Sequence, residues 1–179
     1  MLAAAFLDRD GTLIEERGFI SSADQVRLEV GVVTGLRKLS ALGFQLVVVS
    51  NQSGVGRGFL TLEQAMAVNR RTCELLAEQG ISICGWFMCP HLPTEGCRCR
   101  KPSAGMALAA SEKFGLDLTR SLVIGDKRSD MELAKAIGGL GILVETGYGR
   151  SARDWAVSQG LPVCSSIDAA ADFVLGGSP

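Results

Sequence analysis

Ala3–Thr12 reads AAAFLDRDGT, a short apolar run that ends abruptly in two aspartates, Asp8 and Asp10. Such an uninterrupted apolar run is typical of a strand that is buried on both faces of a parallel sheet. Open α/β sheets bind ligands at the carboxyl ends of their strands, which is where both acids fall. Side chains two residues apart on an extended chain share a face, so both carboxylates can address one reacting group. A solvated turn is the alternative, since Asp and Gly are ordinary turn residues, and the stretch alone favours neither.

The composition is that of one globular domain. The chain has 179 residues, of which 47% are hydrophobic and 21% charged, enough to bury one substantial core without any sign of disorder. A formal net charge of −1 argues against a broad nucleic-acid surface, which would need a basic stripe. The apolar start lacks a basic region and is too short for a signal sequence, and no stretch approaches the ~20 apolar residues of a membrane span. We expect a single domain over residues 1–179 that is cytoplasmic and monomeric, with no nucleic-acid or membrane partner.

Apolar runs alternate with helical patterns along the chain. Strands are expected at Ala3–Leu7, Phe44–Val49, Ile81–Met88, Ser121–Ile124, Leu140–Val144 and Leu161–Val163. Helices are expected around Val33–Leu39, from the capping box at Thr61 to Gly80, over Gly105–Phe114, from a second capping box at Ser129 to Gly138, and over Ile167–Val174. The alternation predicts a doubly wound parallel sheet, a Rossmann-like α/β fold with helices on both faces.

Two segments fall outside this alternation. Ile14–Arg27 and the Cys/Pro/Gly-rich Cys89–Gly105 each follow a strand, so both are expected at the edge of the sheet that carries Asp8. Neither is long enough to build a large cap over that edge. Residues 146–157 are interpreted as a further loop on the same rim, which either contacts the ligand or is a plain connection.

Two polar clusters besides the aspartates suit phosphate. Ser50–Gly54, SNQSG, combines a hydroxyl, an amide and loop N–H groups, which can hold phosphate oxygens without adding charge. Arg100 and Lys101 lie just before a helix. Lys suits the neutralisation of a phosphoryl group and Arg offers a bidentate fork. Taken alone, the first cluster also fits a turn and the second a solvated surface.

A fourth cluster contains Asp126 at the end of an expected strand. A carboxylate there can complete an oxygen site for Mg²⁺, which prefers few carboxylates, water and substrate phosphate. Ser129 and Asp130 are interpreted as capping residues of the next helix, Asp130 because an acid suits the positive helix end. That structural role leaves Asp126 unexplained.

The order of these clusters, an aspartate pair followed by Ser50, Lys101 and Asp126, resembles the haloacid dehalogenase-like phosphohydrolases. The resemblance implies a HAD-type fold in which Asp8 is the nucleophile that forms an aspartyl phosphate and Asp10 is the acid and base. It implies that Ser50 and Lys101 hold the phosphoryl group, and that Mg²⁺ is bound by Asp8, the carbonyl of Asp10 and Asp126. Phosphoryl transfer depends mostly on positioning and charge neutralisation, so clustered carboxylates become tolerable with a metal and a lysine nearby.

A compact group of cysteines lies just before Lys101. Cys89, His91, Cys97 and Cys99 form C-x-H-x5-C-x-C, and His91 is the only histidine of the chain. Three thiolates and one imidazole match a closed, tetrahedral, structural Zn²⁺ site. We expect this metal to fix the loop and thereby to aim Arg100 and Lys101 at the site. The other three cysteines stand inside apolar or helical patterns and are expected to be ordinary buried thiols.

Within the superfamily, the zinc loop and the SNQSG stretch resemble the heptose-bisphosphate phosphatases and, next to them, the histidinol-phosphate phosphatases. The expected reaction is removal of the 7-phosphate of D-glycero-D-manno-heptose 1,7-bisphosphate, in heptose precursor synthesis for lipopolysaccharide or glycan, with histidinol phosphate as the alternative substrate. Arg100 and Lys127 are expected to meet the remaining 1-phosphate. The resemblance implies substrate contacts at Glu16, Arg17, Gly18, Phe19, Asn51, Gln52, Ser53, Arg100 and Lys127.

Two other classes of protein share parts of this pattern. A receiver-type phospho-acceptor switch is also doubly wound and acidic, but it should keep its acyl phosphate, whereas Asp10 would hasten turnover. A zinc-stabilised binding module with a dead site is the other alternative, and the complete set of acids and lysine argues against it.

Overall fold

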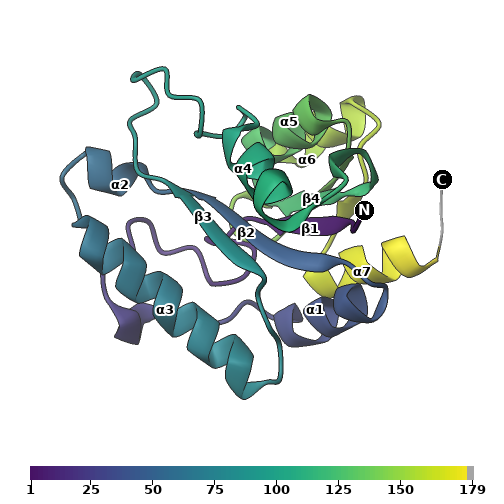
Figure 1. Cartoon of the computed structure of the whole chain (residues 1–179), viewed down its shortest axis with the longest axis horizontal. Coiled ribbons are helices and arrows are strands. Elements are labelled where there is room, and N and C mark those ends of the chain that lie inside the picture. The colour runs from purple at the N-terminus through teal and green to yellow at the C-terminus, as the bar shows by residue number, and fades with distance from the viewer. Residues whose placement is uncertain (177–179) are drawn as a thin grey trace.

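The computed structural model describes residues 1–176, whose strands form one parallel sheet in the order β3-β2-β1-β4-β5-β6 (Figure 1). The expected doubly wound α/β fold is confirmed. The strands are β1 (Ala4–Leu7), β2 (Gln45–Asn51), β3 (Gly85–Cys89), β4 (Leu122–Gly125), β5 (Leu140–Val144) and β6 (Val163–Cys164). The helices are α1 (Val32–Ala41), α2 (Ser53–Gly56), α3 (Leu62–Glu78), α4 (Gly105–Phe114), α5 (Arg128–Ile137), α6 (Gly149–Ser158) and α7 (Ile167–Leu175), with short 3₁₀ turns at Ala23–Gln25 and Leu118–Arg120.

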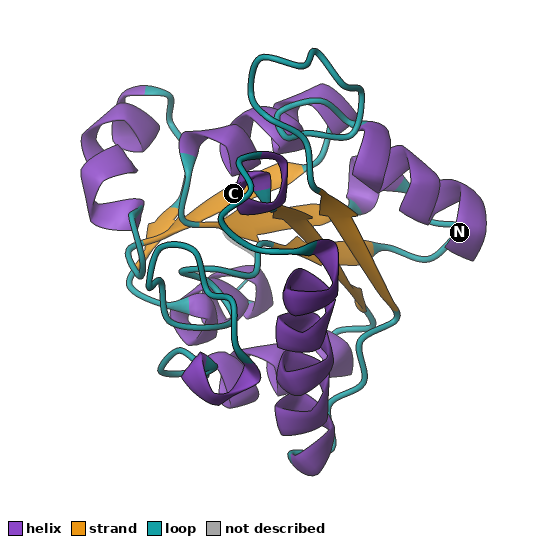
Figure 2. Cartoon of the chain, turned by 90° about the vertical axis from the view of Figure 1, so that its left-hand side faces the viewer, coloured by secondary structure: helices purple, strands orange, loops and turns teal. Residues whose placement is uncertain are grey.

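Helices cover both faces of the sheet, which is the middle layer (Figure 2). Alternate residues of β1 point to opposite faces: Ala5 and Leu7 pack with α1, α3 and α7, whereas Ala4 and Phe6 pack with α4 and α5. A smaller cluster joins α5, β5 and α6. Because both faces of β1 are buried, the strand can be apolar throughout, which explains the uninterrupted AAAFL run.

The strand order reverses beside β1. Phe6 of this strand pairs with Val47 of β2 on one side and with Val123 of β4 on the other. The Asp8 N–H then donates to the carbonyl of Ile124 at 3.0 Å and extends the β1–β4 ladder by one residue. In open α/β sheets the ligand crevice lies at this kind of reversal, so the backbone itself places Asp8 in it.

Three strand boundaries differ from the sequence expectation. β2 continues through Ser50 and Asn51 because β3 still pairs with both residues. β3 begins at Gly85 and not at Ile81, because the Ile81 N–H donates to the carbonyl of Leu76 and closes α3. β6 begins after Leu161 for the same reason, since the Leu161 N–H closes α6. In both cases the apolar residue is a hydrophobic stop after a glycine, a common helix ending.

Two helix expectations are wrong. α5 begins at Arg128, so Ser129 lies inside its first turn, and the Asp130 carboxylate, not Ser129, accepts the Lys127 N–H at 3.0 Å. Residues 146–157 are largely helix α6 and not a loop. Gly147 and Gly149, just before and at the start of this helix, disguised it, although Trp155 and Ala156 pack against the β5–α5 side of the core. None of the helices in the described part of the chain is long and apolar enough to cross a membrane.

Candidate active site

Asp8 and Lys101 form the centre of a polar cluster at the carboxyl end of the sheet. Lys101 Nζ lies 2.8 Å from Asp8 Oδ1 and 2.7 Å from Asp130 Oδ1, and it donates to the carbonyl of Val49 at 2.7 Å. Burial alone would raise the pKa of Asp8, but the ammonium groups of Lys101 and Lys127 outweigh it and hold that pKa below its ordinary value. Burial would lower the pKa of Lys101, and the two carboxylates raise it instead. Asp8 is therefore an anion in a buried place and Lys101 its fixed counter-charge.

Asn51 holds the backbone of Lys101, which is distant in sequence. The Asn51 side-chain N–H donates to the Lys101 carbonyl, and its Oδ1 accepts from the Lys101 N–H, both at 3.0 Å. These two bonds are possible because β2 extends to Asn51 and carries the amide to the same edge as Asp8. Asn51 thus fixes the backbone at Lys101.

Asp126 is completely buried next to Asp8. Its Oδ2 accepts from the Tyr148 N–H at 2.8 Å, while its Oδ1 has no hydrogen-bond partner among residues 1–176. Two glycines enclose the carboxylate, and a Cβ on Gly11 or Gly147 would come within 2.2 or 2.3 Å of Oδ2. Burial, and then the charge of Asp8, raises the pKa of Asp126 to about 7. A buried oxygen that lacks a hydrogen bond and has only the Lys127 ammonium near it, beside a second carboxylate, is a good donor set for a hard cation.

Asp130 is a residue of the site that the sequence reading missed. Its carboxylate is buried and bridges the Lys101 ammonium and the Lys127 N–H. Asp8, Asp126 and Asp130 each offer an oxygen within 4.8 Å of one another, so three acids meet here. The spacing to Asp126 was the available signal, because residues at the start of a helix that follows a strand end lie beside that strand end.

Asp10 points its carboxylate away from the other acids. The guanidinium of Arg9, which is fully buried, binds it with Nη2 at 3.0 Å from Oδ2 and Nε at 3.1 Å from Oδ1. Gln52 Nε2 donates to Asp10 Oδ2 at 2.6 Å and lies 2.7 Å from Ser50 Oγ. Ser50 is thus connected to Asp10 through the Gln52 amide.

Lys127 extends its ammonium over the acids. Its Nζ lies 3.4 Å from Asp126 Oδ1, 3.4 Å from Glu16 Oε2, 3.5 Å from the Asp10 carbonyl and 3.7 Å from Asp8 Oδ2. Burial would lower the pKa of Lys127, and the surrounding carboxylates raise it above its ordinary value. The Tyr148 ring lies 5.2 Å from the same ammonium. Tyr148 lines the cleft, and it belongs to the stretch 146–157 that was expected on this rim.

These groups open into a cleft of about 260 Å³. Three expected residues do not line it: Arg17 is exposed and paired with Glu15, Ser50 lies behind Gln52, and Asp126 lies beside Lys127 in an adjoining hollow. Phe19 stands on the rim, 4.8 Å from Phe59 between ring centroids. The expected residues that line the cleft are Asp8, Asp10, Glu16, Gly18, Phe19, Asn51, Gln52, Ser53, Arg100, Lys101 and Lys127.

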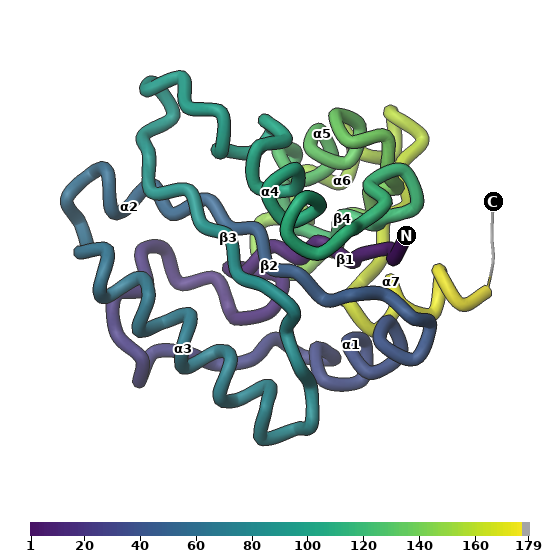
Figure 3. Tube along the Cα trace, in the orientation of Figure 1, coloured from purple at the N-terminus to yellow at the C-terminus, as the bar shows by residue number. Residues whose placement is uncertain are grey.

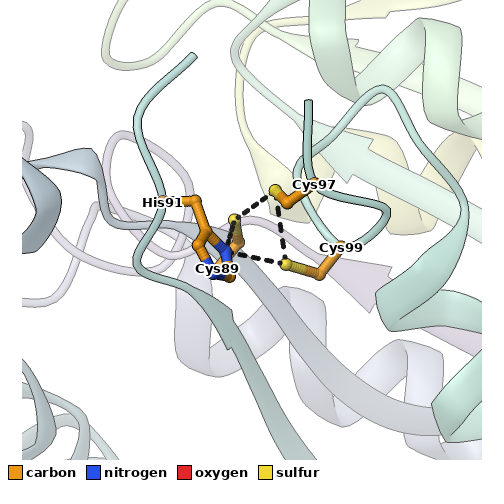
Figure 4. Close-up of side chains that lie close together, drawn as sticks. All are labelled: Cys89, His91, Cys97 and Cys99. Carbon is orange, nitrogen blue, oxygen red and sulfur yellow. Dashed lines mark hydrogen bonds between the residues drawn. The ribbon is translucent and has the colours of Figure 1, made fainter. Parts of the chain in front are cut away.

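The chain between β3 and α4 arches away from the sheet and carries the four expected metal ligands (Figures 3 and 4). Cys97 Sγ lies 3.6 Å from Cys89 Sγ and 3.5 Å from Cys99 Sγ. His91 Nδ1 lies 3.5 Å from Cys89 Sγ and 3.2 Å from Cys99 Sγ. Zinc–sulfur bonds of about 2.3 Å in a tetrahedron require sulfur atoms about 3.8 Å apart. The four side chains therefore already surround a point that fits such an ion.

The arch returns to the cleft directly after its last cysteine. Arg100 Nη1 approaches the carbonyl of His91 at 3.4 Å, and the Gly56 N–H of α2 donates to the carbonyl of Pro90 at 2.9 Å. These contacts tie both arms of the arch to each other and to the rim. Arg100 and Lys101 thus stand at the end of a loop that these contacts hold against the rim.

Comparisons with known proteins agree with this geometry. The HAD-hydrolase-like family matches residues 98–170. A D-glycero-beta-D-manno-heptose-1,7-bisphosphate 7-phosphatase of Yersinia pestis is 38% identical over 180 residues, which cover 96% of this chain and 89% of the relative. The Haemophilus influenzae protein of the same name is 35% identical over 181 residues, which cover 98% of this chain and 92% of that relative.

Comparison with solved structures indicates the same family. The D,D-heptose 1,7-bisphosphate phosphatase of B. bronchiseptica, crystallised with magnesium and phosphate, matches with a TM-score of 0.87 and 30% identity over 99% of this chain and 100% of its own. The enzyme of that name from Burkholderia thailandensis matches with a TM-score of 0.70 and 26% identity over 96% and 98% of the two chains. The aspartate-centred cleft and the cysteine arch thus lie on a fold shared along the whole length with these enzymes. The chain belongs to the haloacid dehalogenase-like hydrolases, in the family of the D-glycero-beta-D-manno-heptose-1,7-bisphosphate 7-phosphatases.

Proposed function

We propose that this chain hydrolyses the 7-phosphate of D-glycero-β-D-manno-heptose 1,7-bisphosphate, with Asp8 as the nucleophile. One observation carries the proposal: Asp8 is a buried carboxylate, kept ionised by Lys101, at the base of an open cleft that also contains Arg100 and Lys127. The identity of the substrate is assigned from the relatives of the same family, whose names give this bisphosphate. Histidinol phosphate, the alternative, has no support among those relatives.

In the first step an Asp8 oxygen attacks phosphorus. The bond from phosphorus to the sugar O7 breaks, its electron pair goes to O7, and O7 takes a proton from Asp10. An alkoxide departs poorly without that proton. Lys101 remains beside the aspartyl phosphate and neutralises charge on the transferred group.

In the second step water attacks the phosphorus of the aspartyl phosphate. Asp10 accepts the water proton, the bond between Asp8 and phosphorus breaks, and its electron pair returns to the Asp8 carboxylate. Inorganic phosphate then leaves with Asp8 and Asp10 in their starting states. Splitting the displacement in two replaces one difficult step by two easier ones.

Two metals fit the residues present. Mg²⁺ would be held by Asp8, the Asp10 carbonyl and Asp126, whose Oδ1 lacks a hydrogen bond, and when bound it would neutralise charge on the phosphoryl oxygens. Zn²⁺ would be held by the four ligands of the arch in a structural role. The complex of the B. bronchiseptica relative with magnesium and phosphate supports the first assignment.

The remaining 1-phosphate needs positive charge outside the reacting centre. Arg100 and Lys127 both line the cleft, and we assign them to this phosphate, with Glu16–Phe19 and Asn51–Ser53 beside the sugar. Arg17 is exposed and turned toward Glu15, so we assign it to support of the loop and not to a substrate contact. A single sheet includes every described strand, which supports one catalytic domain, and we expect it to act as a monomer in the cytoplasm.

The test compares phosphate release from heptose 1,7-bisphosphate with release from histidinol phosphate, each with Mg²⁺ and with a chelator. Phosphorus NMR of the sugar product identifies the phosphate that has been removed. We expect heptose 1-phosphate as the product and loss of activity with the chelator. Faster turnover of histidinol phosphate, or release of the 1-phosphate, would overturn the assignment.

A further inference from the structure

Arg9 is the largest fully buried polar side chain and has no place in the mechanism above. Taking a guanidinium out of water is costly unless carboxylates and acceptors surround it. Asp10 is its one ion-pair partner in the described chain, with Nε and Nη2 both 3.1 Å from Oδ1 and Nη2 3.0 Å from Oδ2. Such a two-point fork fixes the plane of the carboxylate as well as its position.

Asn69 completes the surroundings of Arg9 from a distant helix. Arg9 Nη1 donates to Asn69 Oδ1 at 2.7 Å across 60 residues of sequence. The Asn69 side-chain nitrogen faces the sulfur of Met88 at 3.9 Å, so its oxygen is the atom that faces Arg9. Asn69 therefore fixes the far end of the same guanidinium that holds Asp10.

Gln52 holds Asp10 from the opposite side, and the two holders differ in access. Gln52 lines the cleft, whereas Arg9 is sealed beneath it. A substrate entering the cleft can displace the amide of Gln52 from Asp10 Oδ2, but it cannot reach the guanidinium. Oδ2 would then keep one donor, Arg9 Nη2, and gain room for proton transfer, while Oδ1 stays bound to Arg9 Nε and Nη2.

We propose that Arg9 and Asn69 form a clamp that positions Asp10 for proton transfer, with Gln52 as the substrate-displaced arm. The proposal rests on the function proposed above and adds two positioning residues to it. The clamp keeps the Asp10 oxygens in place through both steps, so that the same carboxyl group can give a proton to O7 and take one from water.

The test substitutes Asn69, because removal of Arg9 would leave the buried Asp10 carboxylate without its ion-pair partner and so disturb the fold as well. Asn69→Leu deletes the acceptor at similar volume, Asn69→Asp retains it, and Arg70→Ala on the same helix is the matched exposed control. Kinetics are measured on heptose 1,7-bisphosphate and on p-nitrophenyl phosphate, whose leaving group departs without a proton. Rapid mixing separates the first turnover from the steady state.

We expect Asn69→Leu to lower kcat on the bisphosphate about 10- to 100-fold, within the range of general acid–base catalysis, with KM changed less than about twofold. On p-nitrophenyl phosphate the first release of nitrophenolate should keep its rate while later turnovers slow by the same factor, because water still needs Asp10. Asn69→Asp should restore most of the loss and Arg70→Ala should resemble the parent.

An unchanged kcat, or equal slowing of the first and later turnovers, would overturn the clamp. Failure of the proposed function gives a different pattern: the parent protein would hydrolyse p-nitrophenyl phosphate but not the 7-phosphate. The comparison of first and later turnovers on p-nitrophenyl phosphate would still decide the clamp in that case.

Discussion

The two groups of ligands in this molecule, the acids at the sheet edge and the thiols of the arch, are assembled in different ways. Asp8, Asp126 and Asp130 follow neighbouring strands or open the next helix, so the hydrogen-bonded sheet brings them together. Cys89, at the end of β3, is the only metal ligand of the arch that a strand places, while Cys97 and Cys99 stand on irregular chain. The sheet can position its ligands without an ion, whereas we expect the order of the arch to depend more on one. Chemistry and loop order should therefore fail separately when each group is disturbed.

The largest effect is expected at the sheet edge. Asp8→Asn removes the nucleophile and should lower kcat by about 10³-fold or more, because no other carboxylate lies in its place. Zinc content and melting temperature should stay near those of the parent, since the arch is untouched. Metal analysis, a thermal melt and phosphate release check this, and near-normal turnover would refute the nucleophile assignment.

Asp126→Asn tests the same edge of the sheet by removing the negative charge of the Asp126 carboxylate. The neutral side chain should weaken Mg²⁺ activation about 10- to 100-fold, measured as the Mg²⁺ concentration for half-maximal rate. It should also stabilise the metal-free protein. The pKa of Asp126 is raised to about 7 in the folded state, so parent stability declines as pH rises from about 4 through 7, and the variant lacks this decline.

Thermal melts in chelator at pH 5 and pH 8 provide the check. The gain in melting temperature of Asp126→Asn should be several degrees larger at pH 8. An equal gain at both pH values would show that Asp126 is not the group that titrates.

The arch gives an intermediate effect. Cys97→Ser should lose zinc, lower the melting temperature by about 10 °C and reduce kcat about tenfold. The activity loss is smaller than that of Asp8→Asn because Asn51 and two carboxylates still hold Lys101. Adding Asn51→Leu should remove the hydrogen bonds that still hold Lys101 and lower kcat further. Metal analysis and kinetics measure both effects. If zinc and melting temperature were unchanged in Cys97→Ser, the arch would not be a metal site.

The smallest effect is expected when Arg100, in the cleft, is compared with the exposed Arg17. Arg100→Ala should raise KM for the bisphosphate about tenfold with little change in kcat, because it removes a charge that binds the non-reacting phosphate. Arg17→Ala, exposed and paired with Glu15, should change KM less than about twofold. Equal effects of the two substitutions would place the 1-phosphate elsewhere.

The sequence was most informative where residue type and backbone period agree. The apolar run before Asp8 and the order of Ser50, Lys101 and Asp126 predicted the fold and the meeting of these groups. It was least informative where a side chain has two plausible duties. Asp130 does cap its helix, through the Lys127 N–H, and only the packed sheet shows that the same carboxylate also faces Lys101.

Long-range partners were beyond reach for a different reason. Arg9 lies between two acids that any reader of the motif would notice, yet Asn69 is an ordinary polar residue on a helix and carries no local signal. Its bond to Arg9 exists because α3 crosses beneath the site, which depends on the packing of the whole sheet. Helix α6 was missed because the glycines before it masked a short apolar face.

The two hydrogen bonds between Asn51 and Lys101 have a consequence for how the length of the arch can vary. One foot of the arch is fixed by the pairing of β3 and the other by the Asn51 amide, so residues 92–96 at its top carry no positional duty toward the cleft. Loop closure costs rise only slowly with length, by about 0.6 kcal/mol per doubling. This arch is therefore a natural insertion point, where segments of other lengths could be grafted between His91 and Cys97 to remodel the mouth of the cleft while the phosphoryl-binding lysine stays where it is.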